Sequence, residues 1–226
     1  MRHAAVMLAL APALICTPAL ADTPEDLLIA AGYTSADKPT ALARINQAIA
    51  LCDASLKRNP GNGDARLQRA LAVSYRGKLN RSRGDLLAAR KVFETLIAAN
   101  PRDAEAQLAL AGWHLGAVLA MGPMMARAAL GARSATGSAA LDRAVAFSGG
   151  RAAMPAFASL ERIQLDPGDV AGARRLAEAS LTATANTRFD KVMQRQAGAL
   201  LAVLRTGNGK AAAAKAKQLM PFSAWD

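Results

Sequence analysis

Apolar residues recur at helical spacing from Pro24 to the end of the chain, in segments separated by short polar turns. No segment alternates apolar and polar residues over the length of a β-strand, so the pattern predicts helices throughout. The first helix is expected to start at Thr23-Pro24, which supplies a capping hydroxyl and an early proline. The expected breaks between helices contain Gly, Pro or Asn and read RNPGNGD, ANPRDAE, FSGGR, LDPGD and RTGNGK. The predicted fold class is therefore all-α.

The ends of the second and fourth predicted helices share one spacing. A small residue is followed four positions later by a larger apolar residue, and an Asn-Pro pair comes after it. The two sets are Ala48, Cys52, Asn59, Pro60 and Ala89, Phe93, Asn100, Pro101. A heptapeptide before the second set, GDLLAAR, recurs later as GDVAGAR and more loosely as GKAAAAK. These echoes predict internal repeats.

The repeated pattern resembles the tetratricopeptide repeat (TPR). Its leading helix would pack through Leu71, Ala72 and Tyr75, and its trailing helix through Ala89, Phe93 and Pro101. The resemblance implies a right-handed solenoid of four to five antiparallel helix pairs, filling one domain over residues 22–226. The repeats are irregular, since Pro60 and Pro101 lie 41 residues apart, whereas the regular repeat has about 34 residues.

The first residues form a separate segment. A basic start and an apolar run lead to Ala19-Leu20-Ala21, which predicts a secretory signal peptide at residues 1–21, cleaved after Ala21. The alternative is a lipoprotein acylated on Cys16, but the residue before it, Ile15, is larger than such sites use. Export into a bacterial periplasm, as a soluble protein, is the expected localisation.

Charge and composition narrow the expected partners. The chain has 28 basic and 17 acidic residues, a formal net charge of +11. An exported protein of this charge favours an acidic protein segment or an anionic membrane surface, and nucleic acid is not an expected partner. Cys52 is the one cysteine after the predicted signal, so no internal disulfide is expected. With His114 as the one histidine after that segment, no metal site, cofactor or catalytic residue is predicted.

The strongest candidate for partner binding is a basic face of the third predicted helix. Arg66, Arg69 and Arg76 share this face, and Arg81 and Arg83 follow it. The simpler interpretation is a solvated basic surface. In TPR-like solenoids the leading helices line the concave side, so the resemblance implies that these arginines face a partner's carboxylates.

The stretch Leu108–Ala126 suggests a second candidate site. It has nineteen residues without a formal charge, long enough to cross a membrane. Its alanine content and the break at Gly122-Pro123 instead favour a buried helix followed by a turn. Trp113, His114, Met121 and Met124 would then line an apolar ligand pocket, unless His114 is only a packing residue.

Two functions follow as expectations. The first is an exported, non-catalytic TPR-like adaptor of the bacterial cell envelope that binds another protein. The alternative is a carrier for a small apolar ligand or lipid, which uses a pocket near Trp113–Met125 and serves as an accessory component of a solute transport system. Neither the partner nor the oligomeric state follows from the sequence.

Overall fold

The computed structural model describes residues 22–225. The predicted signal peptide, its cleavage site after Ala21 and the alternative lipidation site Cys16 lie outside the described residues.

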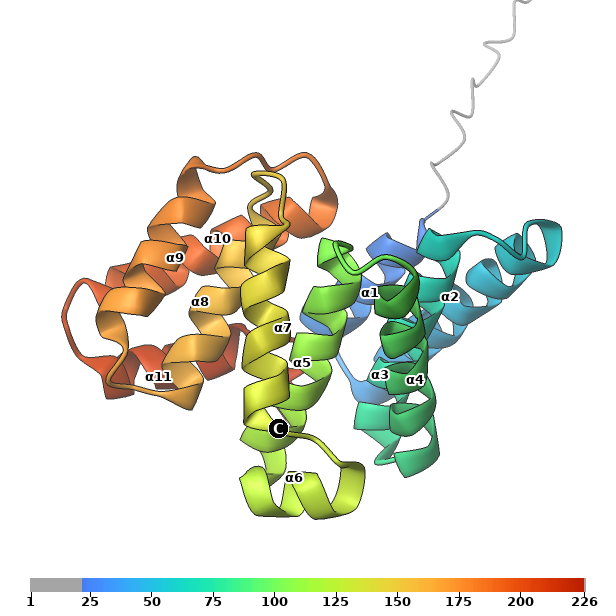
Figure 1. Ribbon diagram of the computed structural model, residues 1–226, viewed down its shortest axis with the longest axis horizontal. Coiled ribbons are helices and arrows are strands. Elements are labelled where there is room, and N and C mark those ends of the chain that lie inside the picture. The colour runs from blue at the N-terminus through green and yellow to red at the C-terminus, as the bar shows by residue number, and fades with distance from the viewer. Residues whose placement is uncertain (1–21, 226) are drawn as a thin grey trace, which may run out of the picture.

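Eleven α-helices and a final 3-10 turn make up the described chain (Figure 1). In chain order the elements are α1 (Pro24–Tyr33), α2 (Lys38–Arg58), α3 (Gly63–Asn80), α4 (Arg83–Ala99), α5 (Ala104–Met121), α6 (Pro123–Leu130), α7 (Ser134–Ala146), α8 (Ala153–Leu165), α9 (Val170–Thr182), α10 (Arg188–Leu204), α11 (Gly209–Leu219) and η1 (Ser223–Trp225). The only β-type pairing within residues 22–225 is an isolated bridge between Arg151 and Thr184. The all-α prediction is confirmed.

Local signals explain most helix boundaries. Thr23 caps α1 as predicted, and its hydroxyl accepts from the Asp26 N–H while the Asp26 side chain accepts from the Thr23 N–H in return. α2 and α4 have Asn59 and Asn100 as their C-caps, each followed by the proline that stops the helix. α5 ends at Met121 because Gly122 has a φ of 78°, a conformation that favours glycine, and α6 begins at the next residue.

Consecutive helices pack mainly against each other. α1 packs on α2, α3 on α4, α5 on α7 and α8 on α9, while α10 contacts both α8 and α9. In the sequence, α6 lies between α5 and α7. In space, α5 and α7 pack directly on each other and α6 projects from the body of the molecule (Figure 1). The expected packing of sequential helices in pairs is therefore present.

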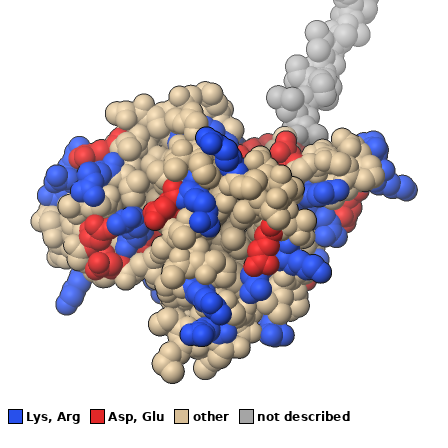
Figure 2. Space-filling model, in the orientation of Figure 1, with Lys and Arg blue, Asp and Glu red and all other residues tan. Residues whose placement is uncertain are grey.

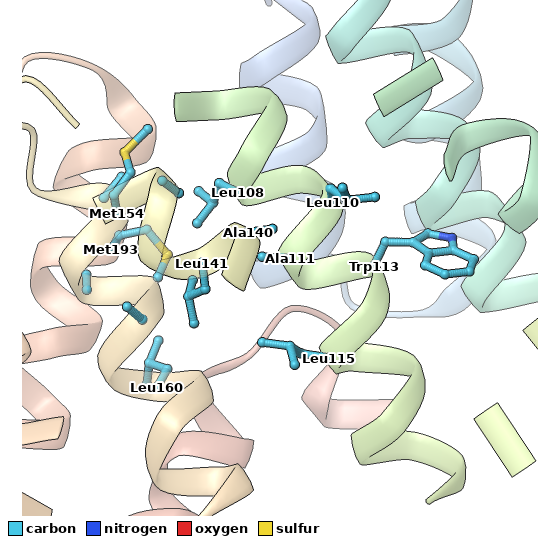
Figure 3. Packing of buried hydrophobic residues seen from close by; sticks show 14 of the residues in the cluster. Leu108, Leu110, Ala111, Trp113, Leu115, Ala140, Leu141, Met154, Leu160 and Met193 are labelled. Atoms are coloured by element: carbon cyan, nitrogen blue, oxygen red, sulfur yellow. The ribbon is translucent and has the colours of Figure 1, made fainter. Parts of the chain in front are cut away.

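The core is continuous through the molecule. Leu115 of α5, Leu141 of α7 and Leu160 of α8 are buried in one cluster, together with Met154 and Met193 (Figure 3). Trp113 points to the other side of α5 (Figure 3), where its indole N–H donates to the Leu86 carbonyl of α4. α5 therefore joins the two halves of the molecule. None of the helices within residues 22–225 is both long and apolar enough to cross a membrane.

The two ends of the described chain contact each other. Arg188 pairs with Asp26 at 2.9 Å, and the Phe189 N–H donates to Glu25, which joins α10 to α1. The Phe222 N–H donates to the Gly32 carbonyl at 2.8 Å. In a linear solenoid each repeat contacts only its neighbours. The first and last helix pairs of this protein are instead held together, so the packing does not by itself establish a solenoid.

Candidate functional site

A hollow of about 380 Å³ lies where the C-terminal segment crosses the end of α3. We call it the α3–tail hollow; its lining residues are Lys38, Lys78, Leu79, Asn80, Arg81, Phe222 and Trp225. Its volume is at the lower end of the range of small-ligand sites. Three cations and two aromatic rings line it, and none of the lining residues within 22–225 is acidic.

Three chain segments bring these residues together. Asp37 caps α2 and so places Lys38 at the first helical position. Arg81 is the C-cap of α3 and has the left-handed conformation, with a φ of 53°. Phe222 is buried, with its ring edge-on to Tyr75 at a centroid distance of 4.9 Å. The hollow therefore depends on the C-terminal segment folding back on α3.

Both walls of the hollow contain an unusual backbone conformation. Among the non-glycine residues of the described chain, only Arg81 and Phe222 have a positive φ, 53° and 67°. Such conformations are unfavourable for residues with a Cβ and concentrate at functional sites. At Arg81 this conformation ends α3, since the Arg81 N–H donates to the carbonyls of Gly77 and Lys78, so Phe222 is the residue whose conformation the helix ends do not explain.

The cations of the hollow differ in how they are paired. Lys78 donates to the Pro221 carbonyl at 3.4 Å and lies 5.6 Å from the centre of the Phe222 ring, so it helps to hold the tail. The exposed side chains of Lys38 and Arg81 make no hydrogen bond or ion pair with any residue between 22 and 225. No carboxylate of the described chain neutralises these two cations.

The structure pairs most of the predicted partner-binding arginines internally. Arg66 donates to the Pro60 carbonyl, and Arg69 pairs with Asp53. Arg83 donates to the Ala129 carbonyl at 2.8 Å. Only Arg81 of the five predicted residues lines the α3–tail hollow.

Arg76 has the strongest of these internal bonds. It binds both carboxyl oxygens of Asp85, at 2.8 and 2.9 Å. These hydrogen bonds hold the pKa of Asp85 below its ordinary value. A two-point charged bond of this kind makes Arg76 a link between α3 and α4 rather than a free contact for a partner.

The residues of the alternative pocket separate in the structure. Trp113 and His114 are buried, whereas Met121 and Met124 are exposed at the end of α5 and the start of α6. The His114 Nδ1 atom accepts from the Arg133 N–H at 3.2 Å. Burial, together with the fields of Arg90 and Arg133, lowers the pKa of His114 to about 4. His114 is therefore a neutral packing residue at neutral pH.

The residues of the proposed repeat lie between helices, apart from the turn proline. Ala72, Ala89 and Phe93 are buried, Leu71 and Tyr75 are half-buried, and Pro101 is exposed in the turn. Cys52, at the position equivalent to Phe93, is also buried, and burial raises the pKa of its thiol. Among residues 22–225, no three potential metal ligands lie close enough together to bind an ion.

Sequence reasoning missed Lys38, which the packing of α2 on α3 brings to the end of α3. It also missed Phe222 and Trp225, which are far in sequence from α3. The segment PFSAWD carried a weak signal, since it places two aromatic residues in a chain with only 4% aromatic residues. A buried acid was also missed: Glu161 of α8 is fully buried, and neither carboxyl oxygen has a hydrogen-bond partner within the described chain. Burial raises the pKa of Glu161 to about 8, although Lys78 acts in the opposite direction.

Comparisons with known proteins add no family. No family model, no curated protein and no solved structure matches the chain.

Proposed function

We propose that this protein is an exported, non-catalytic adaptor built from TPR-like helix pairs, and that it binds an acidic segment of a protein partner. The observation that carries the proposal is the α3–tail hollow, where Lys38 and Arg81 are exposed and pair with no carboxylate among residues 22–225. The irregular repeat and the sequential helix pairs support the TPR-like architecture. The predicted signal at residues 1–21 supports export.

The chemistry of the hollow favours a carboxylate-bearing chain. Arg81 offers a planar set of N–H donors, which suits the two oxygens of a carboxylate. Trp225 is half-buried beside the same cations. A segment with an acidic residue next to an apolar one would use both features. The rest of the basic surface would attract such a segment from a distance, because Lys and Arg are distributed over the face shown in Figure 2.

The test removes the charges of Lys38 and Arg81 without disturbing the helix end. Lys38→Gln is a change at an exposed position, and Arg81→Asn keeps a residue that tolerates the left-handed conformation. A partner captured from envelope extract by the wild-type chain should bind this double variant about tenfold or more weakly, since charge-assisted hydrogen bonds are lost. Binding to the wild type should also weaken as salt is raised.

The matched control is Arg205→Gln with Lys210→Gln. Both residues are exposed at the α10–α11 connection and outside the hollow, and the change in net charge is the same. This control should bind like the wild type. Equal, salt-insensitive binding by all three proteins would contradict the proposed site. Arg69 and Arg76 are poor choices for the test, because their replacement leaves Asp53 and Asp85 unpaired.

The carrier function remains the second proposal and makes a different prediction. Its ligand would be apolar, so binding should be nearly indifferent to salt and to the Lys38→Gln/Arg81→Asn variant. Because Trp113 is buried and Met124 is exposed, only Met124 can contact such a ligand, and its replacement should then weaken ligand binding. Binding that does not depend on salt, and that the replacement weakens, would favour the carrier over the adaptor.

A further inference from the structure

The corner between α5 and α6 exposes an unusual concentration of large apolar side chains. Within residues 22–225, six large hydrophobic residues are exposed, and four of them lie at this corner. We call them the α5–α6 tip: Leu119 (37% exposed), Met121 (40%), Met124 (86%) and Met125 (59%). The segment from Leu115 to Ala126 contains no polar side chain, although it reaches the surface. Such a patch marks an interaction surface.

The shape of the tip decides what kind of surface it fits. α6 projects from the body of the molecule at the end of α5 (Figure 1), and Met124 and Met125, which belong to it, are exposed. The reversal at Gly122 directs Pro123, Met124 and Met125 outward together. A projecting segment can insert into a flat, deformable surface while the rest of the molecule stays outside that surface.

Charges around the tip favour one occupant. No Asp or Glu occurs between Glu105 and Asp142, a span that contains the whole tip. Three arginines, the arginine collar, lie on or against α6: Arg127 belongs to α6, Arg133 follows it, and Arg83 donates to the Ala129 carbonyl of α6. The nearby carboxylates on α4 are already bound, Asp85 by Arg76 and Glu94 by Arg90. An apolar tip with a cationic base is complementary to a bilayer whose surface is anionic.

We propose that the α5–α6 tip is a membrane-docking surface, which inserts its methionines among the lipids of an anionic bilayer while the arginine collar contacts the headgroups. Met side chains suit this role because they are flexible and apolar. The docking is peripheral, since only the end of one helix pair enters the interface. This site is separate from the α3–tail hollow and does not rest on the proposed adaptor function.

The test measures co-sedimentation of residues 22–226 with lipid vesicles. Vesicles of phosphatidylethanolamine and phosphatidylglycerol should bind the protein, and pure phosphatidylcholine vesicles should bind it far more weakly. Met124→Ser with Met125→Ser should lower the partition coefficient on the anionic vesicles by about tenfold or more, because two apolar side chains no longer leave water. Arg127→Gln with Arg133→Gln should lower it as well, and should reduce its dependence on salt.

A matched control is available on the same chain. Leu51 and Leu181 are the other two exposed large hydrophobic residues of the described chain, at 40% and 42% exposure, and lie away from the tip. Leu51→Ser with Leu181→Ser should leave vesicle binding unchanged. Circular dichroism should show equal helix content in all variants.

Three results would overturn the proposal. The first is no binding of the wild type to anionic vesicles. The second is vesicle binding that is lost at high salt but is unchanged in the methionine variant, which indicates general adhesion of a basic protein. The third is unchanged vesicle binding together with lost capture of a protein partner by the methionine variant, which makes the tip a protein-binding surface.

Discussion

Glu161 is an acidic residue in a fully buried position that does not stabilise a charged carboxylate. A carboxylate in a buried position without hydrogen bonds is strongly unfavourable, so the group stays protonated instead. Its oxygens have no partner within the described chain, and Lys78 is the charge that partly offsets the effect of burial on its pKa. The folded state therefore keeps a proton on Glu161 that the unfolded chain releases at much lower pH.

This difference makes stability depend on pH in a defined direction. The pKa of Glu161 is about 8 in the folded state, against an ordinary value of 4.5. Between these values the unfolded state has lost the proton and the folded state holds it, so the free energy of unfolding should fall as pH rises, by at most about 1.4 kcal/mol per pH unit. Glu161→Gln should remove this contribution, which makes the variant more stable than the wild type at pH 8 but not at pH 4.

Urea unfolding from pH 4 to pH 9 provides the measurement. Glu178→Gln, at an exposed glutamate on the neighbouring helix α9, serves as the control and should follow the wild-type curve. Parallel curves for Glu161→Gln and the wild type would contradict the assignment of a buried, protonated acid.

At the scale of the helices, the close approach of α5 and α7 determines how the central pair forms. Gly137 of α7 lies against Leu115 and His114 of α5. A Cβ atom at residue 137 would lie 2.6 Å from the Leu115 Cδ2 atom and 3.0 Å from the His114 Cβ atom. Both neighbours are buried, so they have little space in which to move. A residue without a side chain is therefore required here by packing rather than by backbone conformation.

Gly137→Ala should destabilise the protein by about 1–2 kcal/mol because the added methyl group overpacks the contact. This loss is expected although alanine is the better helix former by about 1 kcal/mol. Gly116→Ala on α5 is the control, since a Cβ atom there meets nothing within 4 Å. It should stabilise the protein by about 0.5–1 kcal/mol. Thermal or urea unfolding of the two variants tests the pair, and a stabilising Gly137→Ala would show that the helices can move apart.

At the scale of the whole molecule, the C-terminal segment joins the last helices to the first. Phe222 is buried against Tyr75, and its N–H binds the Gly32 carbonyl of α1. Tyr33 and Met193 make a further contact between α1 and α10, with 3.6 Å between the hydroxyl and the sulfur atom. If the first and last helices did not contact each other, each end of the chain would unfold on its own. Because they are in contact, they should unfold together.

Phe222→Ala should lower the free energy of unfolding by about 3–5 kcal/mol, as truncation of a buried aromatic residue does. It should also speed amide exchange in α1, although α1 is distant in sequence. Leu51→Ala, a truncation at an exposed position, should change stability by no more than about 0.5 kcal/mol. Hydrogen exchange measured by mass spectrometry reports the stability of both variants and the exchange rate in α1. Unchanged exchange in residues 24–33 of the Phe222→Ala protein would show that the two ends are independent.

The sequence by itself determined the features that depend on neighbours along the chain. Helical periodicity, the Thr23 cap, the stops at Asn59 and Asn100 and the break at Gly122 all involve residues a few positions apart. These local preferences act before any tertiary contact forms, and they predicted the all-α class and the turns that contain Pro, Gly-Gly or Asn-Gly, but not the breaks at residues 34–37, 131–133 and 183–187.

The tertiary structure decided which charged and apolar residues are free. Arg69 and Arg81 were both predicted to face a partner, yet Asp53 binds the first and no described residue binds the side chain of the second. The apolar stretch from Leu108 is buried at its start and exposed at its end only because α6 turns outward. The α3–tail hollow needs Lys38 and Phe222 to meet, and they are separated by nearly the whole described chain. Pairings at such separation depend on the packing of all the helices, which no local pattern specifies.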